Sequence, residues 1–300
     1  MGAKSKIEWC DSTWNPITGC LHGCEYCYAR KIAQRFGAVR IGGMNGQICE
    51  LNEPYRRSKD GQINPYPYEF LPTLHRYLLD KPQHWKKPRN IFAGSMADMW
   101  GAWVPDEWKI EVMEACRKAP QHNYLFLTKD PLGYHIWPTK EHPDYSDVGA
   151  RTDNMWLGVT YTGTEITPRE HQEWDNNFWY IWRMGANILP GNHHTFISIE
   201  PLRRDICEVE DERDGGKILE NFLRPGSFGT PSKFFEWAII GAETGNRKDK
   251  VTPKREWVDK IVELCDRGSI PVFMKESLLP VMGEENMRRD IPPELGGAAW

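Results

Sequence analysis

Residues 18–28, TGCLHGCEYCY, decide how the rest of the chain is interpreted. They place Cys20, Cys24 and Cys27 at C-x3-C-x2-C spacing on one short stretch. Thiolates are the usual protein ligands of iron–sulfur cubanes. Three thiolates on one loop can bind three irons and leave the fourth iron open to chelation by a small molecule, as in open catalytic metal sites. The spacing therefore indicates a metal cluster with one free coordination position.

Other uses of these cysteines explain the pattern less well. A structural zinc site in a binding module needs a fourth ligand, which Cys10 or His22 could supply, but no second C-x2-C pair is present. A redox C-x2-C pair leaves Cys20 unexplained. Gly19 and Gly23 allow the segment to curl around a bulky cluster. The remaining cysteines are scattered: Cys10, Cys49, Cys116, Cys207 and Cys265.

Working outward from this segment, seven short runs rich in β-branched and aromatic residues predict strands. They are a first run within residues 7–18, followed by 90–93 (NIFA), 124–128 (YLFLT), 156–160 (WLGVT), 195–200 (TFISIE), 236–241 (EWAIIG) and 271–275 (PVFMK). The runs are almost continuously apolar, which is typical of parallel strands covered on both faces.

Helical patterns lie between most of these runs. They cover residues 25–36, 68–79, 105–118, 167–184 and 253–266. Repeated strand-then-helix order predicts a parallel α/β fold. Residues 37–67 and 203–233 break the rhythm and are expected to be insertions. We therefore predict a single domain over residues 1–300 with two insertions.

Composition excludes several classes of protein. The 300 residues carry a formal net charge of −4, without a long run of one sign, so bulk nucleic-acid binding is not indicated. An apolar run of membrane-spanning length is absent from the sequence, and so is a signal-peptide pattern, so we expect a cytoplasmic protein without membrane contact. Thiols stay reduced in that compartment, so the eight cysteines require another explanation than disulfides.

With Tyr26 before its last cysteine, the motif resembles the signature of the radical S-adenosylmethionine (SAM) superfamily. More of the chain resembles a phage and bacterial family known as a domain of unknown function, in which the first two cysteines often stand further apart. The resembling segments are residues 7–20, 90–100, 126–129, 156–160, 198–202, 237–245 and 272–276. The resemblance implies a complete or partial (β/α) TIM-type barrel with its site at the carboxyl ends of the strands.

The resemblance also implies site residues. Cys20, Cys24 and Cys27 would hold a [4Fe–4S] cluster, with SAM on the open iron. Tyr26 of the motif would lie toward the cofactor, and polar residues at strand ends would complete the site: Ser95, Asp98 and Thr160 toward the cofactor, and Lys129, Glu200, Glu243 and Lys275 in catalysis or substrate anchoring. Asn15 lies just before the loop. Any one of these polar residues could equally cap a helix or form a salt bridge.

The implied reaction is reductive cleavage of SAM to a 5′-deoxyadenosyl radical that abstracts hydrogen from a substrate. The phage association points to isomerisation of an amino-acid-modified thymine in phage DNA, within the host cytoplasm; tRNA or RNA modification and DNA-lesion repair are the alternatives. Fourteen Trp and eleven Tyr could stack a base or simply fill the interior. A flavodoxin- or ferredoxin-type electron donor, or dithionite in vitro, is the expected partner.

Overall fold

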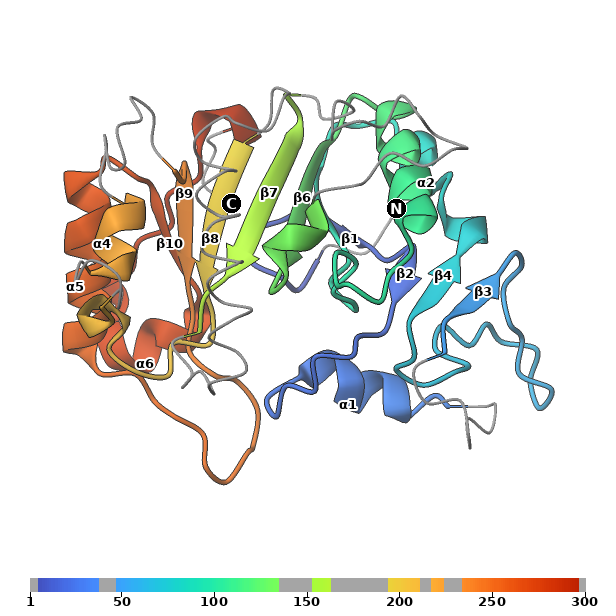
Figure 1. Ribbon diagram of the computed structural model, residues 1–300, viewed down its shortest axis with the longest axis horizontal. Helices are drawn as coiled ribbons and strands as arrows, with labels where there is room; N and C mark the ends of the chain where they lie inside the picture. The colour runs from blue at the N-terminus through green and yellow to red at the C-terminus, as the bar shows by residue number, and fades with distance from the viewer. Residues whose placement is uncertain are drawn as a thin grey trace. The chain divides into compact units, whose positions relative to one another are not determined.

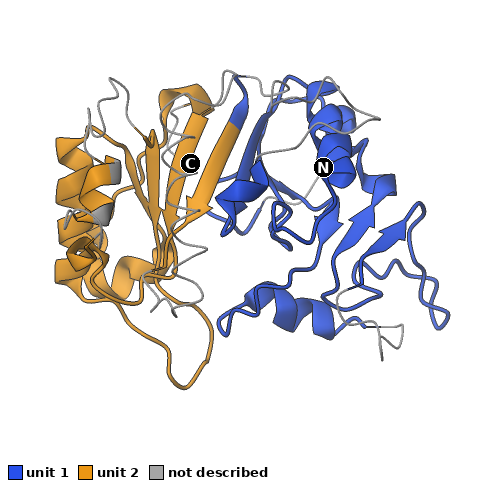
Figure 2. Ribbon diagram, in the orientation of Figure 1, with its two compact units in different colours: residues 1–155 blue, residues 156–300 orange. Residues whose placement is uncertain are grey.

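The computed structural model describes residues 5–37, 47–134, 153–162, 194–210, 217–223 and 234–296. The chain divides into two compact units, residues 1–155 and 156–300 (Figure 2). The expected helix at residues 167–184 lies outside the described residues. The prediction of a single domain with two insertions stays a prediction.

In the first unit, the principal strands run parallel. They are β1 (Ser12–Trp14), β5 (Asn90–Ala93) and β6 (Asn123–Thr128), with β5 in the middle. Trp14 pairs with Ala93, and Ala93 pairs with Phe126. Helix α2 (Asp106–Arg117) connects β5 to β6 and begins just after Pro105, as expected from its sequence. All four side chains of β5 are buried, as its apolar sequence predicts.

A second, small sheet positions the cysteine segment. Its strands are β2 (Ile17–Thr18), β4 (Thr73–His75) and β3 (Cys49–Leu51), with β4 antiparallel to β2 and parallel to β3. The helix expected at residues 68–79 is therefore wrong: the segment contains β4 and a 3-10 turn, η1 (Arg76–Leu78). Pro72 explains the error, because proline inside a helix removes a donor and disfavours helical geometry in the preceding residue.

The described residues from Met155 onward form four parallel strands, which Figure 1 labels β7 to β10. They are β7 (Met155–Thr160), β8 (His194–Ile199), β9 (Trp237–Ile240) and β10 (Val272–Met274). Helix α5 (Arg255–Arg267) connects β9 to β10 and packs beside α4 (Ile218–Leu223). The described residues of the expected insertion at 203–233 contribute Ile206, Leu219 and Leu223 to the buried core.

The shorter elements complete the described chain. They are helix α1 (Tyr28–Gln34), helix α6 (Leu279–Met282) and the 3-10 turns η2 (Lys81–His84), η3 (Pro131–Tyr134), η4 (Ile206–Glu208), η6 (Glu276–Leu278), η7 (Glu284–Asn286) and η8 (Pro293–Leu295).

The hydrogen-bonded strand order is β1-β5-β6-β7-β8-β9-β10. This confirms the α/β class and a parallel sheet, and seven strands fit a partial rather than a complete eight-stranded TIM-type barrel.

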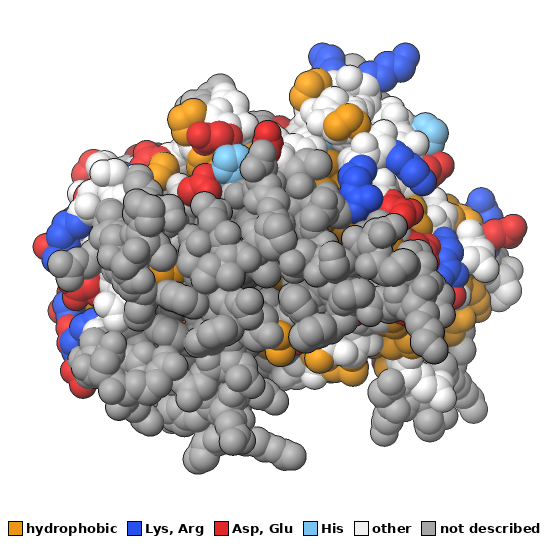
Figure 3. All heavy atoms as spheres, turned by 45° about the horizontal axis from the view of Figure 1, so that its top comes forward, with side chains coloured by type: hydrophobic (Ala, Val, Ile, Leu, Met, Phe, Trp, Pro, Cys, Tyr) orange, Lys and Arg blue, Asp and Glu red, His pale blue; other side chains and the backbone are white. Residues whose placement is uncertain are grey.

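Five of the tryptophans, at positions 14, 100, 108, 156 and 237, are almost fully buried and so fill the interior. On the face shown in Figure 3, the described surface carries acidic and basic side chains side by side. In the described part of the chain, helices of sufficient length and hydrophobicity to cross a membrane are absent.

Candidate functional site

The cysteine loop, residues 19–27, connects β2 to α1 in the first unit. Gly19 and Gly23 both adopt left-handed backbone geometry, with φ of +87° and +72°. A Cβ on Gly19 would lie 2.2 Å from the carbonyl oxygen of Leu71, so glycine is required there on two counts. The backbone of the loop is also held to its surroundings, since the Gly19 N–H donates to the Met96 carbonyl at 2.9 Å.

The three cysteines of the loop are free and partly exposed. The Cys27 sulfur caps α1 and accepts a hydrogen bond from the Arg30 backbone N–H at 3.3 Å. Burial raises the pKa of the Cys20 thiol to about 12, and a backbone hydrogen bond from His22 acts in the opposite direction. Thus the Arg30 N–H points at the Cys27 sulfur, and such a donor stabilises a thiolate or a cluster ligand.

The donor chemistry of this loop fits an iron–sulfur cluster. Three sulfur ligands lie on one short loop, and charges on Cys24 and Cys27 raise the pKa of Cys20, so the three groups share one electrostatic environment. The described residues contain no group of three or more His, Cys, Asp or Glu side chains that lie close enough together to hold a metal ion. Protonated thiols do not attract one another. The three sulfurs therefore come together around a metal only when the metal binds and displaces their protons.

Asp98, which follows β5, contacts the cysteine loop through His22. The Asp98 Oδ2 atom lies 2.8 Å from His22 Nε2 and accepts from the Lys129 backbone N–H at 2.8 Å. Its Oδ1 atom accepts from the Thr128 hydroxyl at 2.7 Å and the Trp100 backbone N–H at 3.2 Å. Burial raises the pKa of Asp98, but these hydrogen bonds and His22 outweigh burial, and the net shift is downward.

Lys129, at the end of β6, contacts the same loop. Its Nζ donates to the Tyr26 hydroxyl at 2.5 Å and lies 5.1 Å from the centre of the Tyr26 ring. Burial lowers the pKa of this lysine, but Tyr26 and Cys24 outweigh that effect, and the net shift is upward. The lysine therefore carries its charge against the loop.

Ser95 lies beside the start of the loop. Its hydroxyl donates to the Asn15 side chain at 3.1 Å, and its carbonyl accepts from the Tyr28 hydroxyl at 2.6 Å. In the structure, Asp98 contacts His22 and Lys129 contacts Tyr26, both in the cysteine loop, and Ser95 contacts Tyr28, which follows the loop. Their roles toward a cofactor stay predictions.

In the second unit, Glu200 and Lys275 are joined by an ion pair between Glu200 Oε1 and Lys275 Nζ. Glu200 follows β8 and Lys275 follows β10, with the end of β9 between them. A Cβ on Gly241 would lie 3.1 Å from both side chains, so glycine at the end of β9 leaves room for the pair. Thr160 ends β7 in the same parallel set and is partly exposed.

Glu243 is held by an arginine that the sequence argument missed. Its Oε1 accepts from Arg247 Nε at 2.7 Å, its Oε2 accepts from Arg247 Nη2 at 3.0 Å, and Arg203 Nε lies 3.9 Å away. The Arg247 hydrogen bonds lower the pKa of Glu243, and burial acts against them. The sequence does contain a signal for this ion pair, because Glu243 and Arg247 carry opposite charges and stand four residues apart.

The two residues that could complete a zinc site with the loop cysteines, Cys10 and His22, each have another partner in the structure. The Cys10 sulfur is buried and donates to the Ser5 hydroxyl at 3.4 Å, and burial raises its pKa to about 11. His22 directs Nε2 at Asp98.

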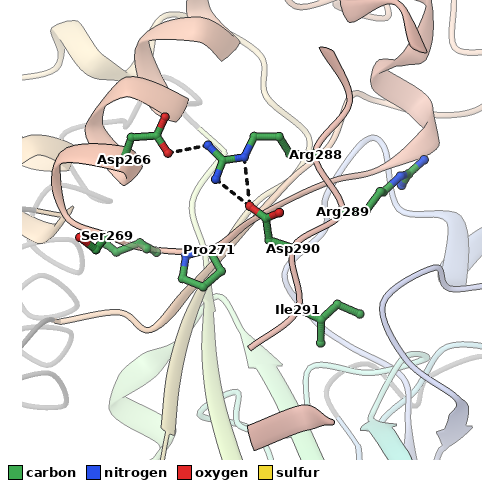
Figure 4. Close-up of a pocket in the computed structure, with 8 residues that line it drawn as sticks. Asp266, Ser269, Pro271, Arg288, Arg289, Asp290 and Ile291 are labelled. Atoms are coloured by element: carbon green, nitrogen blue, oxygen red, sulfur yellow. Dashed lines mark hydrogen bonds and ion pairs between the residues drawn. The ribbon is translucent and has the colours of Figure 1, made fainter. Parts of the chain in front are cut away.

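A hollow of about 490 Å³ lies at the amino end of β10, where Pro271 precedes the strand, whereas Lys275 lies at its carboxyl end. Arg288 lines the hollow and is held between Asp266, at 2.5 Å, and Asp290, at 2.7 Å (Figure 4). The charge of Arg288 is thereby neutralised.

The family model described as "Protein of unknown function (DUF5131)" matches residues 4–286. None of the curated proteins matches the chain. Among solved structures, the chain is similar to "Spore photoproduct lyase complexed with dinucleoside spore photoproduct", with a TM-score of 0.48 and 9% identity over 87% of this chain and 75% of that one. It is similar to a cysteine-to-serine mutant of spore photoproduct lyase with a TM-score of 0.48 and 9% identity over 91% and 79% of the two chains. Likeness at this level carries no argument about function.

Proposed function

We propose that this chain, which belongs to the DUF5131 family, is a radical SAM enzyme whose cluster is held by Cys20, Cys24 and Cys27. The observation that carries the proposal is the cysteine loop itself: three free thiols at C-x3-C-x2-C spacing, of which Cys27 accepts a hydrogen bond from a backbone N–H. A bound [4Fe–4S] cluster would supply one electron that cleaves SAM to methionine and a 5′-deoxyadenosyl radical, which removes a hydrogen atom from substrate.

The contributions of the chain's own residues follow from their contacts. The three thiols bind as thiolates and leave one iron to SAM. The Arg30 N–H stabilises negative charge on the Cys27 sulfur. Lys129 places a positive charge against Tyr26 at the edge of the loop, where it can attract the anionic group of a cofactor or substrate.

The proposed substrate is a modified base in DNA, with isomerisation of an amino-acid-modified thymine as the reaction. Substrate positioning is assigned to Glu200, Glu243 and Lys275, which follow neighbouring parallel strands of the second unit. An ion pair at a strand end presents both a donor and an acceptor, which suits an amino-acid side group carrying an amine and a carboxylate.

The test is anaerobic reconstitution with iron and sulfide, followed by dithionite and SAM, with 5′-deoxyadenosine measured by mass spectrometry. We expect cluster-dependent 5′-deoxyadenosine from the wild-type protein and its loss in Cys24→Ala, because the cubane loses one of three protein ligands. Cys207→Ala is the matched control, since Cys207 is also free and partly exposed but belongs to the second unit. Bound zinc and no product would contradict the proposal.

The substrate is tested by supplying DNA that carries the modified thymine, unmodified DNA, or tRNA to the reconstituted enzyme. We expect the modified DNA to increase 5′-deoxyadenosine formation and to yield a product of unchanged mass. Stimulation by tRNA alone would contradict the substrate assignment while leaving the radical chemistry in place.

A further inference from the structure

We propose that Asp98 and His22 form a latch that holds the cysteine loop in place between Cys20 and Cys24, making both of them positioning residues. This inference rests on the proposed function of the loop as a cluster site. His22 lies between Cys20 and Cys24, so its side chain can hold this part of the loop without using a cysteine ligand.

The Asp98 carboxylate is buried and hydrogen-bonded at both oxygens, which keeps its partners fixed. Each of its oxygens has two donors, from His22, the Lys129 N–H, the Thr128 hydroxyl and the Trp100 N–H. A carboxylate offers about four lone-pair sites, so this set fills it. The residue is also buried, at 6% exposure, which makes each of these hydrogen bonds costly to break.

His22 is fixed on a second side. The ring of Trp103 meets the imidazole edge-on, with 4.8 Å between the ring centres. A Cβ on Gly101 would lie 2.4 Å from the Trp103 ring, so glycine at that position allows the indole to approach. The imidazole is therefore held by a buried carboxylate on one side and by an aromatic ring on another.

His22 stands two residues after Cys20 and two before Cys24, so holding its side chain also holds the backbone between these two cysteines. Solvent exposure of an iron–sulfur cluster and hydrogen bonds to its sulfurs are among the factors that set its reduction potential, and both depend on how this backbone is held. Loss of the latch should therefore change the cluster's electronic properties while all three cysteine ligands remain.

The experiment compares wild-type protein with His22→Leu, which removes the contact to Asp98, and His22→Gln, whose amide can still donate to it. After reconstitution, we would record the EPR spectrum and midpoint potential of the cluster and the rate of iron loss to a chelator. In the apo proteins, we would follow amide hydrogen exchange of residues 19–28.

We expect His22→Leu to load iron but to lose it about 10-fold faster, as is typical when an outer-shell partner is removed. Its EPR signal and potential should shift and its loop amides exchange faster, whereas His22→Gln should behave like wild type. Asp80→Asn is the matched control, because it breaks an exposed His84–Asp80 pair of 3.1 Å away from the loop. This control should leave every readout unchanged.

Three results would overturn the inference. They are a His22→Leu protein with wild-type EPR, potential and exchange; a His22→Gln protein as impaired as His22→Leu; and an Asp80→Asn protein with the same defects. In each case a wild-type protein that loads its cluster keeps the proposed function. A wild-type protein that loads none overturns both the function and the inference.

Discussion

His75 is a buried titratable group of the small sheet, with 1% of its surface exposed. Its Nε2 atom lies 2.8 Å from the Thr18 hydroxyl and its Nδ1 atom 3.3 Å from the Tyr77 hydroxyl. Burial lowers the pKa of His75 to about 4. The folded protein therefore holds this imidazole neutral at pH values where the unfolded chain protonates it at about pH 6.5.

The sign of the resulting pH dependence follows from proton binding. Between about pH 6.5 and pH 4 the unfolded chain binds a proton that folded His75 does not, so stability falls as the pH falls through this range. The full effect is about 3 kcal/mol, because a tenfold change in proton affinity corresponds to about 1.4 kcal/mol. We expect His75→Gln to be less sensitive to pH than wild type in urea unfolding at pH 7 and pH 5. Parallel pH dependence in the two proteins would contradict this account.

Single residues of the site were easier to find in the sequence than their partners. Asp98 and Lys129 were selected because they follow predicted strands, and the structure places both beside the cysteine loop. Their contacts with His22 and Tyr26 join residues 76 and 103 positions apart. Partners at such distances depend on strand register and side-chain packing, which a sequence pattern does not specify.

At the scale of elements, Cys27 has two separable functions. Its sulfur accepts from the Arg30 N–H at the start of α1, and in the proposed function it also binds iron. Serine can replace it as a helix cap but is a poor iron ligand. We expect Cys27→Ser and Cys27→Ala both to lose the cluster, but the apo Ser variant to be more stable than the Ala variant by about 1 kcal/mol in urea unfolding. Equal stabilities would show that the cap contributes nothing.

The strands were predictable because their residues are apolar almost without interruption. The run at residues 90–93 matches β5, and the run at 195–200 is displaced by one residue from β8. The segment at 68–79 failed because its apolar spacing fits a helix while Pro72 opposes one. In that segment the backbone pairs with β2 and β3 instead, a long-range interaction that local periodicity does not report.

At the scale of the molecule, repeated strand and helix patterns predicted the parallel sheet, but not the division into units of residues 1–155 and 156–300. The described residues 206–208 and 218–223 show why composition misleads. Their neighbours in the sequence are charged or rich in glycine, yet Ile206, Leu219 and Leu223 are buried in the core of the second unit. A few apolar side chains are enough to bury part of a segment that is polar overall, and the average composition of the segment does not reveal them.

The eight cysteines allow one measurement over the whole chain. Cys10, Cys49, Cys116 and Cys265 are buried, whereas Cys20, Cys24, Cys27 and Cys207 are partly exposed, and all eight are free. Only an accessible thiolate reacts quickly with an alkylating reagent. Burial also raises the pKa of Cys20 and Cys207 to about 12, which slows both of them near neutral pH.

We therefore expect the native apo protein to be labelled by iodoacetamide first at Cys24 and Cys27, then at Cys20 and Cys207. The four buried thiols should react only when urea unfolds the chain. Loading with iron and sulfide should protect the three loop cysteines together and leave Cys207 as reactive as before, because Cys207 belongs to the other unit. Peptide mass spectrometry of the alkylated protein gives the order site by site. Protection of Cys24 and Cys27 without Cys20 would mean that a two-cysteine site, and not a three-cysteine cluster, binds the metal.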